Sequence, residues 1–333
     1  MSAVPASRLA PAAALPPERR RAKRRAAWRR RRLVLLLMSP WLVGFSVFFA
    51  YPLVTNEYLS FTHYDLLSSP RWIGLSNYDF LFNKDPSLWP AVRNTLWMVA
   101  IAVPLQVVFA IGVAVALTRA RTGAGVFRTV FYLPTLAPTV AATLGFVFLL
   151  NPATGPVNTI LGHVGVDNPP LWFNSPSWSK PALVLLALWG IGNTMVIFLA
   201  ALLDVPKHLY ESAELDGAGP LQRFRWVTLP SISPVILFAV VIAVIEALQY
   251  FTQAYVAAQI ARGGQAGDSL SVLGYPEGST LFYPVLLYQQ GFRFFNMGYA
   301  SAMAVLLLVV SFAVTMVIVR NSRRWVHVAG VGR

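Results

Sequence analysis

The sequence predicts an all-α integral membrane protein with six transmembrane helices. Of its 333 residues, 56% are hydrophobic and only 12% are charged, whereas a soluble domain carries about 25% charged residues. At least five nearly uncharged runs reach roughly 18 residues, the length that crosses a hydrocarbon core of about 30 Å. The chain contains no cysteine, so disulfides and thiolate metal sites are unavailable.

Six apolar runs can be drawn as membrane spans. They cover approximately residues 33–54, 92–118, 129–150, 181–203, 232–254 and 298–319. Three prolines inside them, Pro104, Pro134 and Pro138, are expected to kink or interrupt helices, and Gln106 to serve the backbone freed by the first of these kinks. Neighbouring helices must satisfy the freed carbonyls, so the sequence predicts a packed bundle.

The basic residues predict the orientation. With the N-terminus inside, 21 of the 27 Lys and Arg residues lie on the cytoplasmic side, which indicates an N-in, C-in topology by the positive-inside rule. We interpret residues 1–32 as a disordered basic tail, 33–320 as the six-span membrane domain and 321–333 as a second cytoplasmic tail. We expect the first tail to be attracted to the anionic headgroups at the lipid bilayer surface. Nucleic acid is not an expected partner.

The loops predicted to face outward, residues 55–91, 151–180 and 255–297, are rich in aromatic residues. We expect their tryptophans and tyrosines, such as Trp172 and Tyr283, to lie at the membrane–water interface. Asn94 and Thr95 lie near the outer end of the second span. We expect them to cap that helix.

The polar segment 204–231, between the fourth and fifth spans, predicts a cytoplasmic helix–turn–helix elbow. Pro206 suits the first turn of a helix, and Gly217 is a natural helix stop. Pro220 can then open a second short helix, which Pro230 ends. We call residues 204–231 the elbow.

Two interpretations of the elbow are open from its residues alone. The small side chains of Ser212 and Ala213 permit close approach by another protein, and carboxylates such as those of Glu211 and Asp216 can pair with a partner's arginines. An ordinary solvated loop would also contain such charges and helix stops.

The elbow contains "ESA", which begins at Glu211. Three intervening residues separate it from Gly217, and nine further residues separate Gly217 from "VTLP", which ends at Pro230. This spacing resembles the EAA signature of the permease subunits of binding-protein-dependent ABC importers, with Ser212 in place of Ala and Val227 in place of Ile. "LVGFSVFFAYPLV" and "GYASAMAVLLLVV" are similar to the carbohydrate and glycerol-phosphate uptake branch of that family, in particular to its longer first permease subunit.

The resemblance implies a function. The chain would form half of a translocation pathway for a sugar or a related polyol or glycerol phosphate in a bacterial cell membrane. The implied partners are a second homologous permease subunit, two cytoplasmic ATP-binding subunits and an extracytoplasmic solute-binding protein. The resemblance also implies that the elbow docks onto the ATPase through Glu211, Ser212, Ala213, Asp216, Gly217, Leu229 and Pro230.

Polar residues at bilayer depth are the candidates for the substrate path, because such groups are costly there and usually functional. Glu246 is the clearest, and Gln249, Tyr250 and Gln253 follow at helical spacing on the same face. Hydrogen-bonding and aromatic groups together suit a polyhydroxylated solute. Asn193 is a weaker candidate, and contacts between helices are the alternative role for all five.

Catalysis is not expected. The chain has no G-x-x-x-x-G-K-[ST] phosphate-binding motif, so another polypeptide must bind ATP, and we expect no cofactor. The four histidines lie outside the spans and far apart in sequence, which predicts no metal site. The alternative function is a stand-alone secondary transporter or channel, for which only Glu246 offers an ion-coupling charge within the spans.

Overall fold

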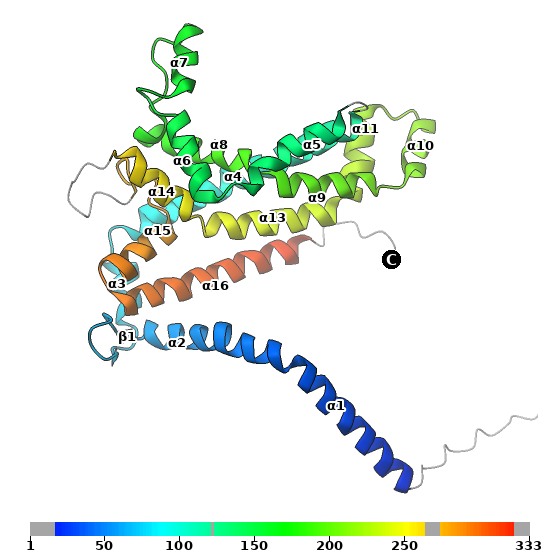
Figure 1. The fold of residues 1–333 in the computed structure, drawn as a ribbon, viewed down its shortest axis with the longest axis vertical. Helices are drawn as coiled ribbons and strands as arrows, with labels where there is room; N and C mark the ends of the chain where they lie inside the picture. Colours follow the sequence, from blue (N-terminus) through cyan, green and yellow to red (C-terminus); the bar gives the residue numbers. More distant parts are fainter. Residues whose placement is uncertain (1–16, 121–122, 264–273, 323–333) are drawn as a thin grey trace, which may run out of the picture. The chain divides into compact units, whose positions relative to one another are not determined.

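The computed structural model describes residues 17–120, 123–263 and 274–322. The chain divides into two compact units, residues 1–56 and 57–333. Figure 1 shows the elements of both units in the colours of the sequence.

The first unit is helical throughout its described residues. Helix α1 (Pro17–Phe45) continues through one π-helical turn, η1 (Ser46–Ala50), into α2 (Tyr51–Ser60). The expectation of a disordered tail is wrong for residues 17–32, because alanine and arginine favour helix and a proline suits its first position. Residues 1–16 lie outside the described residues. The stretch Trp28–Ser60 is long and apolar enough to cross a membrane.

The second unit is a helical bundle with one small hairpin, in which β1 and β2 pair antiparallel. Its elements are, in order, β1 (Thr62–His63), β2 (Arg71–Trp72), α3 (Ser76–Asn83), α4 (Leu88–Arg119), α5 (Ala124–Tyr132), η2 (Leu133–Leu136), α6 (Thr139–Leu149), α7 (Pro156–His163), η3 (Trp172–Asn174), α8 (Pro176–Trp189), α9 (Gly192–Leu203), α10 (Lys207–Leu215), α11 (Pro220–Arg223), η4 (Phe224–Thr228), α12 (Leu229–Ser231), α13 (Ser233–Leu248), α14 (Thr252–Ala261), α15 (Tyr283–Tyr288), η5 (Gln289–Arg293) and α16 (Met297–Ser322).

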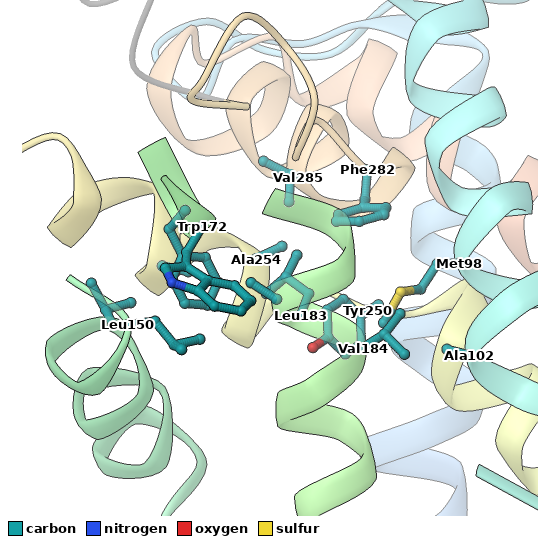
Figure 2. Close-up of a cluster of buried hydrophobic side chains, with 14 residues drawn as sticks. Met98, Ala102, Leu150, Trp172, Leu183, Val184, Tyr250, Ala254, Phe282 and Val285 are labelled. Carbon is teal, nitrogen blue, oxygen red and sulfur yellow. The ribbon is translucent and has the colours of Figure 1, made fainter. Parts of the chain in front are cut away.

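Helix α4 is the centre of this bundle and contacts α8, α9 and α13, while α13 also packs on α16 (Figure 1). Two large apolar clusters meet along α4. The first joins its N-terminal half to α6, α8, α14 and α15, and Figure 2 shows its side chains, among them Met98 and Leu183. The second joins the C-terminal half of α4 to α9 and α13, around Met195 and Phe198. The buried face of α4 therefore organises the unit.

Three pairs of neighbouring helices are bent, two of them within expected spans and the third where the elbow meets the fifth expected span. The helix pair around residues 137–138 is bent by 103°, the pair around 190–191 by 49°, and the pair meeting at Ile232 by 69°. Counting each bent pair as one span, the described residues provide up to six spans, and otherwise three. Pro138 accounts for the first break, because a proline disfavours helical backbone in the residue before it, and Ala137 has an extended ψ of 131°. Pro104, by contrast, lies inside the continuous helix α4.

The fifth expected span ends earlier than predicted. Helix α13 stops at Leu248, and residues 249–251 are not helical before α14 begins. A continuous helix to residue 254 is therefore wrong. No glycine or proline marks this break in the sequence. Instead, Tyr250 packs edge-on against Phe282, with the ring centroids 5.7 Å apart.

Two other expectations are also corrected. Trp172 and Tyr283 are buried, because the Trp172 indole donates a 2.7 Å hydrogen bond to Asn158 and the Tyr283 hydroxyl a 2.8 Å bond to the Met303 carbonyl. Both side chains are therefore enclosed by protein and do not face the surroundings of the chain.

Asn94 and Thr95 do not cap α4, which begins six residues before Asn94, at Leu88. The Asn94 amide donates to the carbonyl oxygens of Gly278 and Leu281, at 2.8 and 3.0 Å. The Thr95 hydroxyl accepts a 2.9 Å bond from the Tyr283 backbone. Both side chains therefore hold the segment before α15 against α4.

Candidate functional site

The turn of the elbow is fixed by hydrogen bonds. After α10, the backbone N–H of Ala218 donates to the Ala213 carbonyl at 2.9 Å, and that of Gly217 to the Glu214 carbonyl at 3.0 Å. Gly217 has a φ of +77°. This pair of bonds around a left-handed residue is the Schellman motif. A Cβ on Gly217 would meet no atom within 4 Å, so the backbone conformation, not space, requires glycine there.

The second half of the elbow is held against the first. Pro220 opens α11, as the sequence predicts, and the Gln222 side chain accepts a 2.8 Å bond from the Gly219 backbone. An ion pair joins Arg223 of α11 to Glu214 of α10. The Tyr210 and Thr228 hydroxyls lie 3.0 Å apart and share a hydrogen bond. These contacts join α10 to the elements that follow the turn. The two halves of the elbow are therefore connected by side-chain contacts as well as by the backbone.

The inner side of the elbow is joined to the membrane bundle. Tyr210 and Phe224 pack against the second apolar cluster, which buries Val205 and Ile232 at the two ends of the elbow. Thr228 is also buried. Force applied to the elbow would therefore reach α4, α9 and α13 directly through packed side chains.

The outer side of the elbow is exposed and partly apolar. Leu215, Leu221 and Trp226 are 90, 79 and 71% exposed. They were not singled out from the sequence, although large apolar residues in a polar segment are a usable signal. Of the seven predicted docking residues, Glu211, Ser212, Asp216 and Gly217 are exposed, whereas Ala213, Leu229 and Pro230 are half-buried.

A cavity of about 460 Å³ lies within the bundle, and the helix breaks around residues 137–138, 190–191 and 249–251 line it. We call it the central cavity. Its walls come from α4, η2, α6, α8, α9, α13 and α14. Its polar lining residues are Gln106, Thr135, Thr139, Asn193, Thr194, Glu246, Gln249, Tyr250, Thr252 and Gln253.

All five predicted substrate-path residues line the central cavity: Asn193, Glu246, Gln249, Tyr250 and Gln253. The reason given for grouping four of them was wrong, because the helix ends at Leu248 and a single helical face does not join them. The break itself turns them toward one space. Gln106, which was expected only to serve the backbone freed at Pro104, lines the same cavity.

The central cavity presents polar side chains inside an otherwise apolar bundle. Glu246 and Gln249 are exposed to it, and Glu246 makes no ion pair among the described residues. The buried Tyr250 hydroxyl likewise has no hydrogen-bond partner in this part of the chain. Figure 2 shows the Tyr250 ring lying below Phe282, beside Val184 and Met98. Trp189 and Phe251 add aromatic surface to the lining.

The cavity wall at the start of α9 depends on close backbone packing. A Cβ on Gly192 would lie 2.7 Å from the Phe131 carbonyl oxygen and 2.9 Å from the Tyr132 Cα. Helix α9 can therefore approach α5 and η2 this closely only with glycine at its first position.

No group of three His, Asp or Glu side chains that could hold a metal ion occurs within residues 17–120, 123–263 and 274–322. The buried Asp85 instead accepts a 2.6 Å hydrogen bond from the Tyr299 hydroxyl, which ties it to α16. The central cavity and the elbow are therefore the two candidate sites.

Comparisons with known proteins agree with this arrangement. The chain is 38% identical to the probable ABC transporter permease protein YesP of Bacillus subtilis, over 87% of this chain and 90% of that protein. It is 32% identical to the arabinooligosaccharides transport system permease protein AraP of the same species, over 85% and 86% of the two chains.

Among solved structures, the chain resembles one described as a bacterial ABC transporter involved in the import of the acidic polysaccharide alginate. The TM-score is 0.76 at 23% identity, and the match covers 91% of this chain and 99% of that one. At this identity the likeness concerns the fold. In addition, the sequence model for the binding-protein-dependent transport system inner membrane component matches residues 106–328. The chain is thus a multi-pass membrane protein that belongs to the family of binding-protein-dependent transport system inner membrane components.

Proposed function

We propose that this chain is one permease subunit of an ATP-driven importer and forms half of the pathway for a sugar or a related polyol. Its relatives include permeases named for arabinooligosaccharides, lactose and sulfoquinovosyl glycerol. The sugar pathway is the central cavity. Its amides and hydroxyls can replace the water that a polyhydroxylated solute loses, and Trp189 and Phe251 offer surface to the C–H faces of sugar rings.

In this proposal the chain has six spans with both termini in the cytoplasm, and the helix pairs that bend around residues 137–138 and 190–191 each form one span. The elbow then projects into the cytoplasm and docks onto an ATP-binding subunit. The observation that carries the proposal is the two-sided construction of the elbow. Its inner side packs on the bundle through Tyr210 and Phe224, whereas its outer side leaves Leu215, Leu221 and Trp226 exposed.

The exposed leucines and tryptophan would fill an apolar cleft of the ATPase, where such residues contribute most of the binding energy. Glu211 and Asp216 would pair with arginines at its rim. Closure of the ATPase dimer would push the elbow, and the packed contacts would pass that movement to α9 and α13. Two ATPase subunits, a second permease and an extracytoplasmic solute-binding protein complete the assembly.

The test is co-purification of the ATPase with single-site variants of the elbow. Leu215→Asp should abolish co-purification and solute uptake while leaving membrane insertion intact, because a carboxylate would be placed in the cleft. Val164→Asp is the matched control, since Val164 is also highly exposed but lies directly after α7, away from the elbow in sequence. It should retain the ATPase.

If Leu215→Asp and Glu211→Lys both keep ATPase binding and uptake, the docking role is wrong. Uptake that survives ATP depletion while a proton gradient is maintained would instead favour the second candidate, a stand-alone secondary transporter, in which Glu246 would be the ion-coupling group.

A further inference from the structure

The central cavity carries a charge of one sign. Among the described residues, Glu246 and the Tyr250 hydroxyl are the only ionisable groups in its lining, and no Lys, Arg or His lines it. The other polar lining groups are neutral amides and hydroxyls. The carboxylate is exposed to the cavity and makes no ion pair among the described residues. The formal charge of the lining is therefore negative.

The helix ends at the cavity do not reverse this sign. Each helix carries about half a positive charge at its N-terminus and half a negative charge at its C-terminus. Three helices begin beside the cavity, at Thr139, Gly192 and Thr252. Three helical segments end there, at Leu136, Trp189 and Leu248. Their partial charges oppose one another, so Glu246 decides the local potential.

The surroundings strengthen the effect of this one charge. The cavity is set in apolar packing, with Ala102 and Ala247 in its lining nearly inaccessible. A cleft lined by one sign of charge with walls of low dielectric constant concentrates ions of the opposite sign and excludes those of the same sign. Neutral solutes are affected least.

We propose that the central cavity selects neutral or cationic sugars, such as amino sugars, and disfavours uronates, sugar phosphates and sugar sulfonates, with Glu246 as the residue that sets this preference. This proposal rests on the proposed function for its solute class, but the sign of the potential can be measured without transport. It narrows the solutes expected from the sequence, because it argues against a glycerol phosphate.

The absence of cysteine from the chain permits a direct measurement. Asn193→Cys places one thiol in the cavity lining. The full transporter with its partner subunits is reconstituted in nanodiscs and treated with a cationic trimethylammonium or an anionic sulfonate methanethiosulfonate reagent. Each rate is divided by the rate with a small thiol in solution. We expect the cation-to-anion ratio to be about tenfold, as for a charge several ångströms away in a partly hydrated site.

Glu246→Gln in the Asn193→Cys background should bring this ratio close to one, because the amide keeps the shape and removes the charge. Glu57→Gln is the matched control, since Glu57 lies outside the cavity lining, and it should leave the ratio unchanged. Thr139→Cys provides a second position if Asn193→Cys does not assemble. A ratio at or below one in the parent, or a ratio that Glu246→Gln does not lower, overturns the proposal.

The solute class is tested on the same thiol by protection. Trisaccharides of glucose, glucosamine and glucuronate are added at equal concentration, and the slowing of the reaction with a neutral maleimide is measured. Glucosamine and glucose trisaccharides should protect several-fold better than glucuronate, and Glu246→Gln should remove the difference. Equal or better protection by glucuronate overturns the charge selection. If no sugar protects while the charge ratio behaves as expected, the sugar pathway of the proposed function fails instead.

Discussion

Replacement of Gly192 by alanine tests whether close helix packing builds the cavity wall. The added Cβ would lie 2.7 Å from both the Phe131 carbonyl oxygen and the Thr135 Cγ2, distances that carbon atoms in folded proteins avoid. Two of the three nearest atoms belong to the backbone, so rotation of a side chain cannot relieve the contact. Helix α9 must move away from α5, and such overpacking costs about 1–3 kcal/mol.

The assay is thermal unfolding of the purified protein in detergent, followed by tryptophan fluorescence. A loss of this size should lower the unfolding midpoint by several degrees. Gly112→Ala is the matched control, because Gly112 lies inside α4 and a Cβ there would meet no atom within 4 Å. It should be neutral or slightly stabilising, since alanine favours helix by about 1 kcal/mol over glycine. Equal midpoints for the two variants would refute the packing argument.

Three further predictions concern the turn, a titrating group and a buried hydroxyl. Gly217→Ala forces a side chain into the left-handed region at a cost of about 1 kcal/mol, so it should reduce co-purification of the ATPase. Gly219→Ala, at a φ of −70°, should not reduce it. If both variants retain the ATPase equally well, the rigid-turn argument is contradicted. The hydrogen bond from Lys84 holds the pKa of the Asp79 carboxyl below its ordinary value of 3.8. The contact between the two side chains should therefore persist above pH 3.8 and be lost as the pH falls through the lowered pKa. An NMR titration that gives the Asp79 carboxyl a pKa above 3.8 would disprove this. Tyr250→Phe should leave the thermal midpoint unchanged or raise it, because its hydroxyl is buried without a partner among the described residues, and a clear loss of stability would show a missing hydrogen bond.

Much of the elbow could be predicted because its chemistry is local. Gly217 and Pro220 act within one turn of their own positions, and the hydrogen bonds around them follow from backbone geometry. The exposure of Leu215 and Trp226 could not be predicted in this way. It depends on which face of each short helix packs on the bundle.

Five residues of the central cavity lining were chosen as substrate-path candidates by residue type and not by geometry. Glu246 and Gln249 were identified because polar groups are rare at bilayer depth. The helix break at residues 249–251 carries no local signal, since it arises where Tyr250 packs on Phe282, a residue distant in sequence. Helix over residues 17–32 was missed for the opposite reason, because the charge pattern was given more weight than the helix propensity of alanine and arginine.

The two apolar clusters lie on opposite sides of the helix breaks around residues 137–138, 190–191 and 249–251. One contains α6, α8 and α14, and the other contains α9 and α13 and carries the elbow. Each cluster can therefore keep its own packing while the chain bends at the breaks, with α4 as the unbroken rod that passes through both. A push on the elbow would tilt one half of the bundle about a pivot that coincides with the cavity wall, so that a small rotation changes the shape of the cavity without repacking either core.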